Sequence, residues 1–125
     1  MGEQQKNILL VEDHEILGET VVSAFRRKGI VLTWLQTFKD AKQAIARLPQ
    51  EPFDPIILDA NLTEGESDGW EGEALLNDIR GIAPETFIIG FSAGREFPGE
   101  PDFFISKRSP SAMEDLLKAV QARIR

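Results

Sequence analysis

The sequence of 125 residues contains no cysteine, no tyrosine and a single histidine. The lack of cysteine excludes a disulfide framework, a thiolate zinc site and a cysteine nucleophile. A single histidine, His14, excludes a polyhistidine metal site and disfavours a Ser-His-Asp triad. We expect His14 to be an exposed residue at the N-terminus of a helix. These absences remove several classes of metalloprotein and hydrolase at once.

Long apolar runs and excess positive charge are also lacking. No run approaches the roughly 20 apolar residues of a membrane span, and residues 1–6 (MGEQQK) lack the apolar core of a signal peptide. The 14 Lys and Arg residues are outnumbered by 21 Asp and Glu residues, for a net charge of -7. Such a balance repels phosphate backbones. We therefore expect a soluble, cytoplasmic protein that binds no membrane and, by itself, no nucleic acid.

Apolar runs alternate with amphipathic stretches along the chain, and the length predicts one domain over residues 1–125. Strands are expected at 7–11, 30–35, 56–58, 87–91 and 103–105. Helices are expected at 15–28, 38–48 and 70–80, and from 110 to the end. This alternation predicts an α/β fold, a parallel sheet with helices on both faces.

Local signals refine the boundaries of these elements. Thr37 with Asp40 resembles a capping box, Pro55 is placed to open the third strand, and Ser109 with Pro110 is expected to cap and start the last helix. Two prolines and a glycine in residues 95–101 argue against a full helix between the fourth and fifth strands.

Polar side chains follow four of the predicted strands. They are Glu12 and Asp13, Asp59, Ser92, and Lys107. In open parallel sheets, ligands bind at the carboxyl ends of the strands. We therefore expect three carboxylates, a hydroxyl and an ammonium to converge at one edge of the sheet.

Three adjacent carboxylates repel one another unless a cation lies between them. Oxygen ligands favour Mg²⁺, which also accepts substrate phosphate oxygens. Lys107 and Ser92 are suited to bind further phosphoryl oxygens. Asp59 stands alone at the end of a central strand, so we choose it as the nucleophile that forms an acyl phosphate. This interpretation predicts phosphoryl-group chemistry.

Four segments, ILLVEDH, PIILDAN, GFSAG and FFISK, together resemble the response regulator receiver (CheY-like) domain of two-component signalling. The resemblance implies a three-layer, doubly wound, flavodoxin-like sheet of five parallel strands in the order 2-1-3-4-5. It implies that Glu12 and Asp13 bind Mg²⁺, the one cofactor expected, together with Asp59 and the backbone carbonyl of Asn61. It also implies phosphorylation of Asp59, phosphate binding by Lys107, and a switch formed by Ser92 and Phe104.

The resemblance further implies that a histidine kinase or histidine phosphotransfer protein phosphorylates the chain, which is not itself an enzyme. Ala93 is small and leaves room for water, so we expect fast self-dephosphorylation. We expect a stand-alone domain without an output domain, signalling by contact with an unknown downstream protein. The alternative is a receiver-fold interaction module that works without phosphorylation.

The chain departs from the family pattern at several places. Leu62 and Thr63 replace the usual Met-Pro in a longer loop, Arg108 replaces the proline after the lysine, and Phe104 replaces the frequent tyrosine. The segment between Ser92 and Lys107 is short, so we expect the fourth helix to be reduced or absent.

The remaining expectations concern surfaces and packing. We expect phosphorylation to expose or hide Phe97, and a partner surface that includes Phe103 and the last helix. Trp34 is interpreted as a packing residue and Trp70 as an anchor for the third helix. Five acids are expected to form a solvated rim, namely Glu64, Glu66, Asp68, Glu71 and Glu73.

Overall fold

The computed structural model describes residues 7–48, 50–60, 70–94, 97 and 99–124. Five strands form one parallel sheet in the order β2-β1-β3-β4-β5. The strands are β1 (Asn7–Val11), β2 (Leu32–Leu35), β3 (Phe53–Leu58), β4 (Ile88–Ser92) and β5 (Phe103–Ser106). The predicted fold class and strand order are therefore confirmed.

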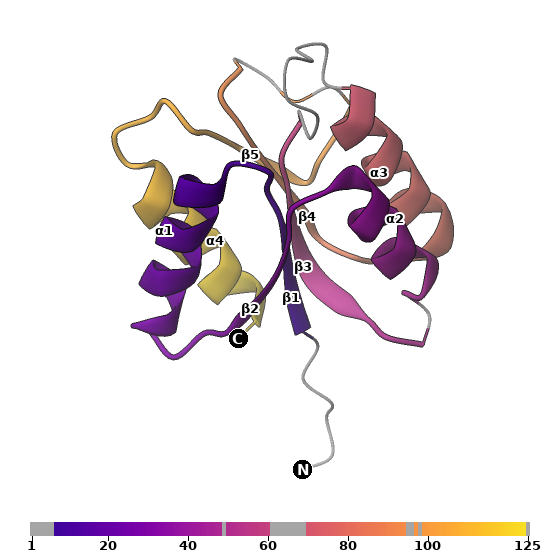
Figure 1. Ribbon diagram of the computed structural model, residues 1–125, viewed down its shortest axis with the longest axis horizontal. Helices are drawn as coiled ribbons and strands as arrows, with labels where there is room; N and C mark the ends of the chain where they lie inside the picture. The colour runs from indigo at the N-terminus through magenta and orange to yellow at the C-terminus, as the bar shows by residue number, and fades with distance from the viewer. Residues whose placement is uncertain (1–6, 49, 61–69, 95–96, 98, 125) are drawn as a thin grey trace.

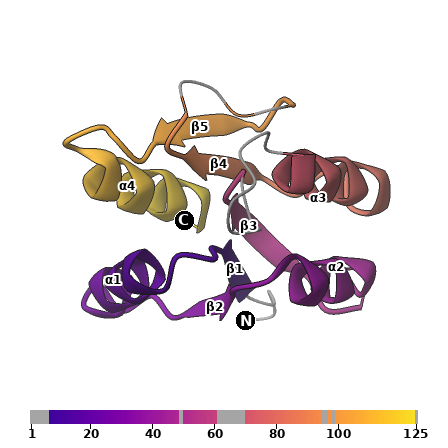
Figure 2. The same cartoon turned by 45° about the horizontal axis from the view of Figure 1, so that its top comes forward.

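Helices cover both faces of this sheet (Figures 1 and 2). Helices α1 (Glu15–Arg26) and α4 (Ala112–Ile124) lie on one face, and α2 (Phe38–Ala46) and α3 (Trp70–Ile82) lie on the other. Each face has its own hydrophobic cluster, because alternate residues of the central strands point to opposite sides. In β1, for example, Leu9 packs toward α2 and α3, and Leu10 packs toward α1 and α4.

Polar side chains fix the start of two helices. The N-cap of α1 is His14, whose Nδ1 accepts a hydrogen bond from the Leu17 N–H at 3.2 Å. The N-cap of α2 is Thr37, whose hydroxyl accepts from the Asp40 N–H at 3.1 Å. Both satisfy backbone donors that a helix start leaves unpaired. His14 is exposed at a helix N-terminus, as predicted.

Several predicted boundaries differ from the observed ones by one to three residues, and two of them have a clear physical reason. Strand β3 begins at Phe53 and continues through Pro55, since Phe53 already pairs with Asn7 of β1. Helix α4 begins at Ala112 and not at residue 110. Its start is displaced because the Ser109 hydroxyl accepts from the nearby Ser111 N–H in a local turn.

The prediction of a reduced or absent fourth helix is not borne out. Four helices are present in the described part of the chain, and α4 has 13 residues with a buried face of Ala112, Leu116 and Val120. This helix follows β5. The described residues between β4 and β5 (93–94, 97 and 99–102) are bends and extended chain, and residues 95–96 and 98 lie outside the described residues.

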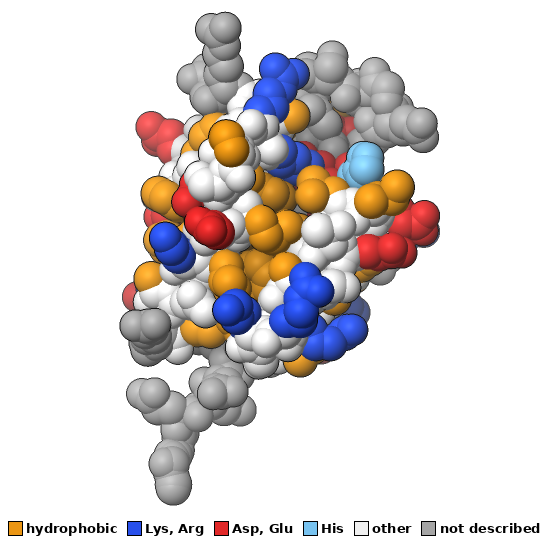
Figure 3. All heavy atoms as spheres, turned by 90° about the vertical axis from the view of Figure 1, so that its left-hand side faces the viewer, with side chains coloured by type: hydrophobic (Ala, Val, Ile, Leu, Met, Phe, Trp, Pro, Cys, Tyr) orange, Lys and Arg blue, Asp and Glu red, His pale blue; other side chains and the backbone are white. Residues whose placement is uncertain are grey.

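The face covered by α1 and α4 presents a strip of hydrophobic side chains between charged ones (Figure 3). Half-buried members of the underlying cluster lie on both helices, namely Leu17, Val22, Met113, Leu117 and Ala119. A search of the described helices finds none that has both the length and the apolarity needed to cross a bilayer.

Candidate phosphoacceptor site

The β1–α1 junction places the first acidic pair. Glu12 follows β1 directly, and its backbone N–H donates to the Leu35 carbonyl of β2 at 3.0 Å. Its side chain is fully buried, and its Oε2 accepts from the His14 N–H at 3.1 Å. Asp13 is half-buried beside it. The end of the central strand β1 thus holds two carboxylates at the carboxyl edge of the sheet.

Asp59 follows β3 at the same edge. Its backbone N–H donates to the Val11 carbonyl at 3.0 Å, and its side chain is buried. Helix α3 approaches closely behind it, because a Cβ on Gly72 would lie 2.7 Å from the Asp59 carbonyl oxygen. Glycine at this position therefore allows α3 to pack against the strand end that carries Asp59.

The carboxylates of Glu12, Asp13 and Asp59 meet in space, with one oxygen of each within 4.8 Å of the others. Lys107, after β5, reaches the same point. Its Nζ lies 2.8 Å from Glu12 Oε1 and 3.2 Å from Asp59 Oδ2, and it donates a hydrogen bond to Glu12 Oε2 at 3.1 Å. Its contact with Oε1 is an ion pair without hydrogen-bond geometry. The ammonium of Lys107 thus contacts two of the three carboxylates of this cluster.

This surplus of negative charge changes the chemistry of Asp59. Burial, followed by the charge of Glu12, raises the pKa of Asp59 to about 8, although Lys107 acts in the opposite direction. Hydrogen bonds with Asp13 and Glu12 raise this pKa further. Without an added cation, the cluster therefore holds a proton on Asp59 at neutral pH.

Ser92 and Phe104 lie on the neighbouring strands. Ser92 ends β4, is buried, and accepts at Oγ from the Gly94 N–H at 3.4 Å. Its carbonyl accepts from the Lys107 N–H at 2.8 Å, which joins the two strand ends. Phe104 is half-buried and packs against the cluster on the α2/α3 face. Asn61 lies outside the described residues.

Phe97 is buried on the same face of the sheet as Phe104. Its ring covers Gly90 of β4, where an added Cβ would lie 2.7 Å from the ring. Gly90 in turn pairs with Phe104 of β5. Phe97 therefore covers part of the α2/α3 face of the sheet, next to β4.

The prediction that Glu71, in the first turn of α3, is exposed to solvent is wrong. This residue was expected in a solvated rim, but it is fully buried, and neither of its carboxylate oxygens has a hydrogen-bond partner among the described residues. Glu73 is exposed, as expected. Glu64, Glu66 and Asp68 lie outside the described residues. Burial of Glu71 follows from the close packing of α3, which residue-level patterns do not reveal.

The two tryptophans differ in their surroundings. Trp70 is 48% exposed at the start of α3 and packs edge-on against Phe38, with 5.3 Å between ring centroids. Trp34 is half-buried on β2, and its indole N–H donates to the Glu12 carbonyl at 2.9 Å. This bond to the acidic pair joins residues 22 positions apart, so it leaves no signal in the local sequence.

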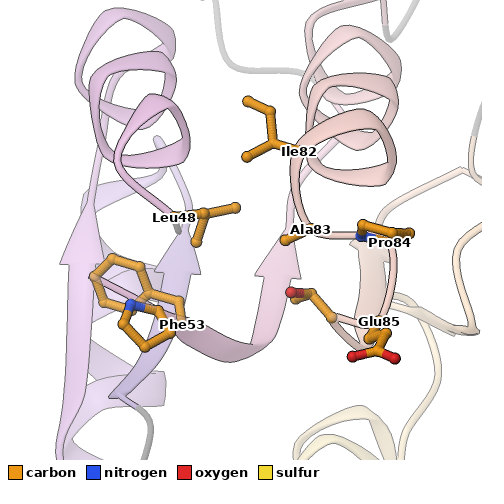
Figure 4. A pocket seen from close by; sticks show the side chains of 8 residues that line it. Leu48, Phe53, Ile82, Ala83, Pro84 and Glu85 are labelled. Atoms are coloured by element: carbon orange, nitrogen blue, oxygen red, sulfur yellow. The ribbon is translucent and has the colours of Figure 1, made fainter. Parts of the chain in front are cut away.

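A pocket lies at the opposite edge of the sheet, between the ends of α2 and α3 (Figure 4). Its volume is about 330 Å³ and its lining includes Leu48, Phe53, Ile82 and Glu85. The strand-end cluster with its four charged side chains, and not this pocket, therefore forms the candidate site.

Comparison with known proteins agrees with this arrangement. The family model of the response regulator receiver domain matches residues 8–121. The chain belongs to this family. Receiver domains are signalling modules of two-component systems and are generally not enzymes. Comparison with curated protein sequences finds no match.

Solved structures show the same fold. The non-phosphorylated HemR receiver domain from Leptospira biflexa is 23% identical, with a TM-score of 0.74, and the match covers 95% of this chain and 94% of that one. A response regulator receiver protein from Sinorhizobium medicae is 21% identical, with a TM-score of 0.75 and coverage of 97% and 95%. The receiver fold therefore extends over almost the whole chain.

Proposed function

We propose that this receiver domain accepts a phosphoryl group on Asp59 in a Mg²⁺-dependent reaction and signals through contact with another protein. The observation that carries the proposal is the meeting of three carboxylates within 4.8 Å, with Lys107 bridging Glu12 and Asp59. A buried cluster of this composition is costly without a further cation. Its position at the carboxyl edge of a parallel sheet is where α/β folds bind ligands.

The donor set fits Mg²⁺ by its chemistry. Glu12, Asp13 and Asp59 offer only oxygen ligands, and the Asn61 carbonyl and solvent would supply the remaining ones. When bound, the ion neutralises carboxylate charge and favours the developing charge on phosphoryl oxygens. The raised pKa of Asp59 supports this assignment, because a cation beside it would favour the ionised form that attacks.

The chain's own residues then carry the transfer. A carboxylate oxygen of Asp59 attacks the phosphorus of the donor, and a new O–P bond forms as the P–N bond to a phosphohistidine breaks. The leaving imidazole takes that electron pair. Lys107 already lies 3.2 Å from Asp59 Oδ2 and can bind a phosphoryl oxygen as charge builds there. The Ser92 hydroxyl, which accepts from the Gly94 N–H, can move toward another oxygen and donate its own proton to it.

The same movement of Ser92 provides a route for the signal. Ser92 shares its strand with Gly90, which carries Phe97 above it and pairs with Phe104. Since Phe97 is buried in this structure, phosphorylation would shift the equilibrium toward its exposure. Phe103, 46% exposed on the edge strand β5, and α4 would contribute the rest of the partner surface. A population shift needs only such differential contacts in two states.

The phosphoryl donor would be a histidine kinase or a histidine phosphotransfer protein of the cytoplasm. Ala93 beside Ser92 is small and exposed, so water can reach the acyl phosphate and self-dephosphorylation should be fast. The net charge of -7 favours a protein partner over nucleic acid.

The direct test is incubation with acetyl phosphate and Mg²⁺, followed by intact-mass and peptide mass spectrometry. We expect one adduct on Asp59 that requires Mg²⁺ and disappears in Asp59→Asn. Asp78→Asn on α3 is the matched control and should be phosphorylated normally. If the folded wild type forms no adduct with acetyl phosphate or beryllofluoride, the interaction module that works without phosphorylation becomes the better account.

Hydrogen exchange tests the output route separately. Beryllofluoride should lower protection in the described part of residues 94–106. If protection changes only around α1, the output surface lies elsewhere and the role given to Phe97 is wrong.

A further inference from the structure

Trp34 connects the edge strand β2 to the acidic pair. Its indole N–H donates to the Glu12 carbonyl at 2.9 Å, and the neighbouring Leu35 carbonyl accepts from the Glu12 N–H at 3.0 Å. Both backbone polar groups of Glu12 are therefore held by β2. A tryptophan side chain, and not the sheet ladder, supplies one of these two bonds.

The ring of Trp34 also fixes the first helix. It lies against Gly18 of α1 so closely that a Cβ at that position would fall 2.0 Å from Cζ2 and 2.3 Å from Cε2. Glycine inside a helix is destabilising relative to alanine, so its presence in α1 needs a reason. The contact with the Trp34 ring is that reason, and it fixes the distance between α1 and β2.

The junction between β1 and α1 lies between these two contacts. It carries Glu12 and Asp13, and its His14 is the N-cap of α1. Because the carboxylates of Glu12, Asp13 and Asp59 repel one another, a loose junction would let the first two move away from the third. The clamp on Glu12 opposes that movement.

We propose that Trp34 is a positioning residue that holds Glu12 and Asp13 in the arrangement that binds a divalent cation. This inference rests on the proposed function, since it concerns the same metal site. Trp34 touches neither the metal nor the phosphoryl group and acts through the backbone of Glu12. Groups of this kind, one step removed from the ligands, commonly change metal affinity by about 10- to 100-fold when replaced.

The test is the variant Trp34→Phe, which keeps an aromatic ring on the strand and removes the indole N–H. Calorimetric titration with Mg²⁺ should show affinity reduced by about 10-fold. Amide hydrogen exchange on the metal-free protein should show lower protection at the β1–α1 junction. Trp70→Phe makes the same chemical change on the other face of the sheet and should leave both measurements close to wild type.

A third readout uses the wild-type chain and so does not depend on the variant folding. The indole N–H resonance of Trp34 should move during the Mg²⁺ titration with the same dissociation constant as calorimetry. Unchanged Mg²⁺ affinity and unchanged junction exchange in Trp34→Phe would overturn the positioning role. Failure of wild type to bind Mg²⁺ would instead refute the proposed metal site, and junction exchange in the metal-free variant would still decide whether Trp34 holds the acidic pair.

Discussion

The two ends of the parallel strands, the carboxyl edge and the amino edge of the sheet, differ in how their carboxylates are paired with cations. At the carboxyl edge, Lys107 pairs with Glu12 and Asp59, which belong to a cluster of three carboxylates. At the amino edge, Asp54 and Asp102 each have their own guanidinium. Asp54 accepts two hydrogen bonds from Arg123, at 2.9 and 2.8 Å, and Asp102 accepts one from Arg80 at 3.1 Å.

The two carboxylates at the amino edge also accept hydrogen bonds from backbone N–H groups. Asp54 accepts from the Phe87 N–H at 3.3 Å, and Asp102 accepts from the Ile88 N–H at 2.8 Å. Arg80 donates in addition to the carbonyls of Thr86 and Glu100. These bonds fix α3, α4 and the strand starts to one another. Balanced, hydrogen-bonded charge of this kind holds the fold, whereas the surplus charge at the other edge is suited to bind a cation.

The largest expected change in stability comes from breaking the ion pair between Arg123 and Asp54 at the amino edge. Arg123→Met leaves the buried carboxylate of Asp54 without its bidentate partner and should lower the free energy of unfolding by about 2 to 3 kcal/mol. This estimate lies below that for a fully buried pair, since the Arg123 side chain is 39% exposed. Urea denaturation measures the loss. Mg²⁺ affinity should remain that of wild type, and a large drop in affinity would contradict the division between the two edges.

The next effect is the pH dependence of stability that Asp59 produces at the carboxyl edge. The pKa of Asp59 is about 8 in the folded protein against 3.8 for the ordinary group. Between these values the folded chain keeps a proton that the unfolded chain has lost, so stability falls as pH rises through this window. Without metal, we expect the free energy of unfolding of wild type to fall between pH 5 and 9 relative to that of Asp59→Asn.

Denaturation of both proteins across that pH range measures this difference. Asp59→Asn should be more stable than wild type at pH 8, and saturating Mg²⁺ should reduce the gap by stabilising wild type. Parallel pH profiles for the two proteins would show that Asp59 keeps an ordinary pKa.

A smaller effect is expected at Glu71, which is buried without a hydrogen-bond partner among the described residues. Replacing such a group by an uncharged one of similar size removes a desolvation cost, so Glu71→Gln should raise the free energy of unfolding by about 1 kcal/mol. Glu73→Gln, at an exposed position on the same helix, should change it little. A clear destabilisation by Glu71→Gln would mean that its carboxylate has a stabilising partner.

The smallest effect is expected from Arg80→Met. The Arg80 and Asp102 side chains are 30% and 36% exposed, so solvent screens their ion pair and its loss should cost about 0.5 to 1 kcal/mol. The change should be local. Hydrogen exchange should quicken at the amides of Ile88 and Asp102, and unchanged exchange there would show that the bonds of Arg80 do not hold the β4–β5 segment.

The sequence predicted the charged cluster at the carboxyl edge better than the ion pairs at the amino edge. Glu12, Asp59 and Lys107 each follow an apolar run, so knowing that the strands are parallel was enough to bring them together. Asp54 and Arg123 lie 69 positions apart, and their pairing depends on how α4 crosses the sheet. Burial of Phe97 likewise depends on the tertiary path of a short segment. Contacts made by helix placement leave no periodic signal in the chain.

A divalent cation should relieve the surplus negative charge at the carboxyl edge. Calorimetric titration of the wild type with Mg²⁺ at pH 7, in two buffers of different ionisation enthalpy, tests this binding together with the proton release that should accompany it. Because Asp59 is protonated there in the metal-free protein, Mg²⁺ binding should release a proton, and the observed heat should differ between buffers. Asp59→Asn should bind more weakly and without this buffer dependence. Binding by wild type with the same heat in both buffers, or no binding at all, would contradict the account.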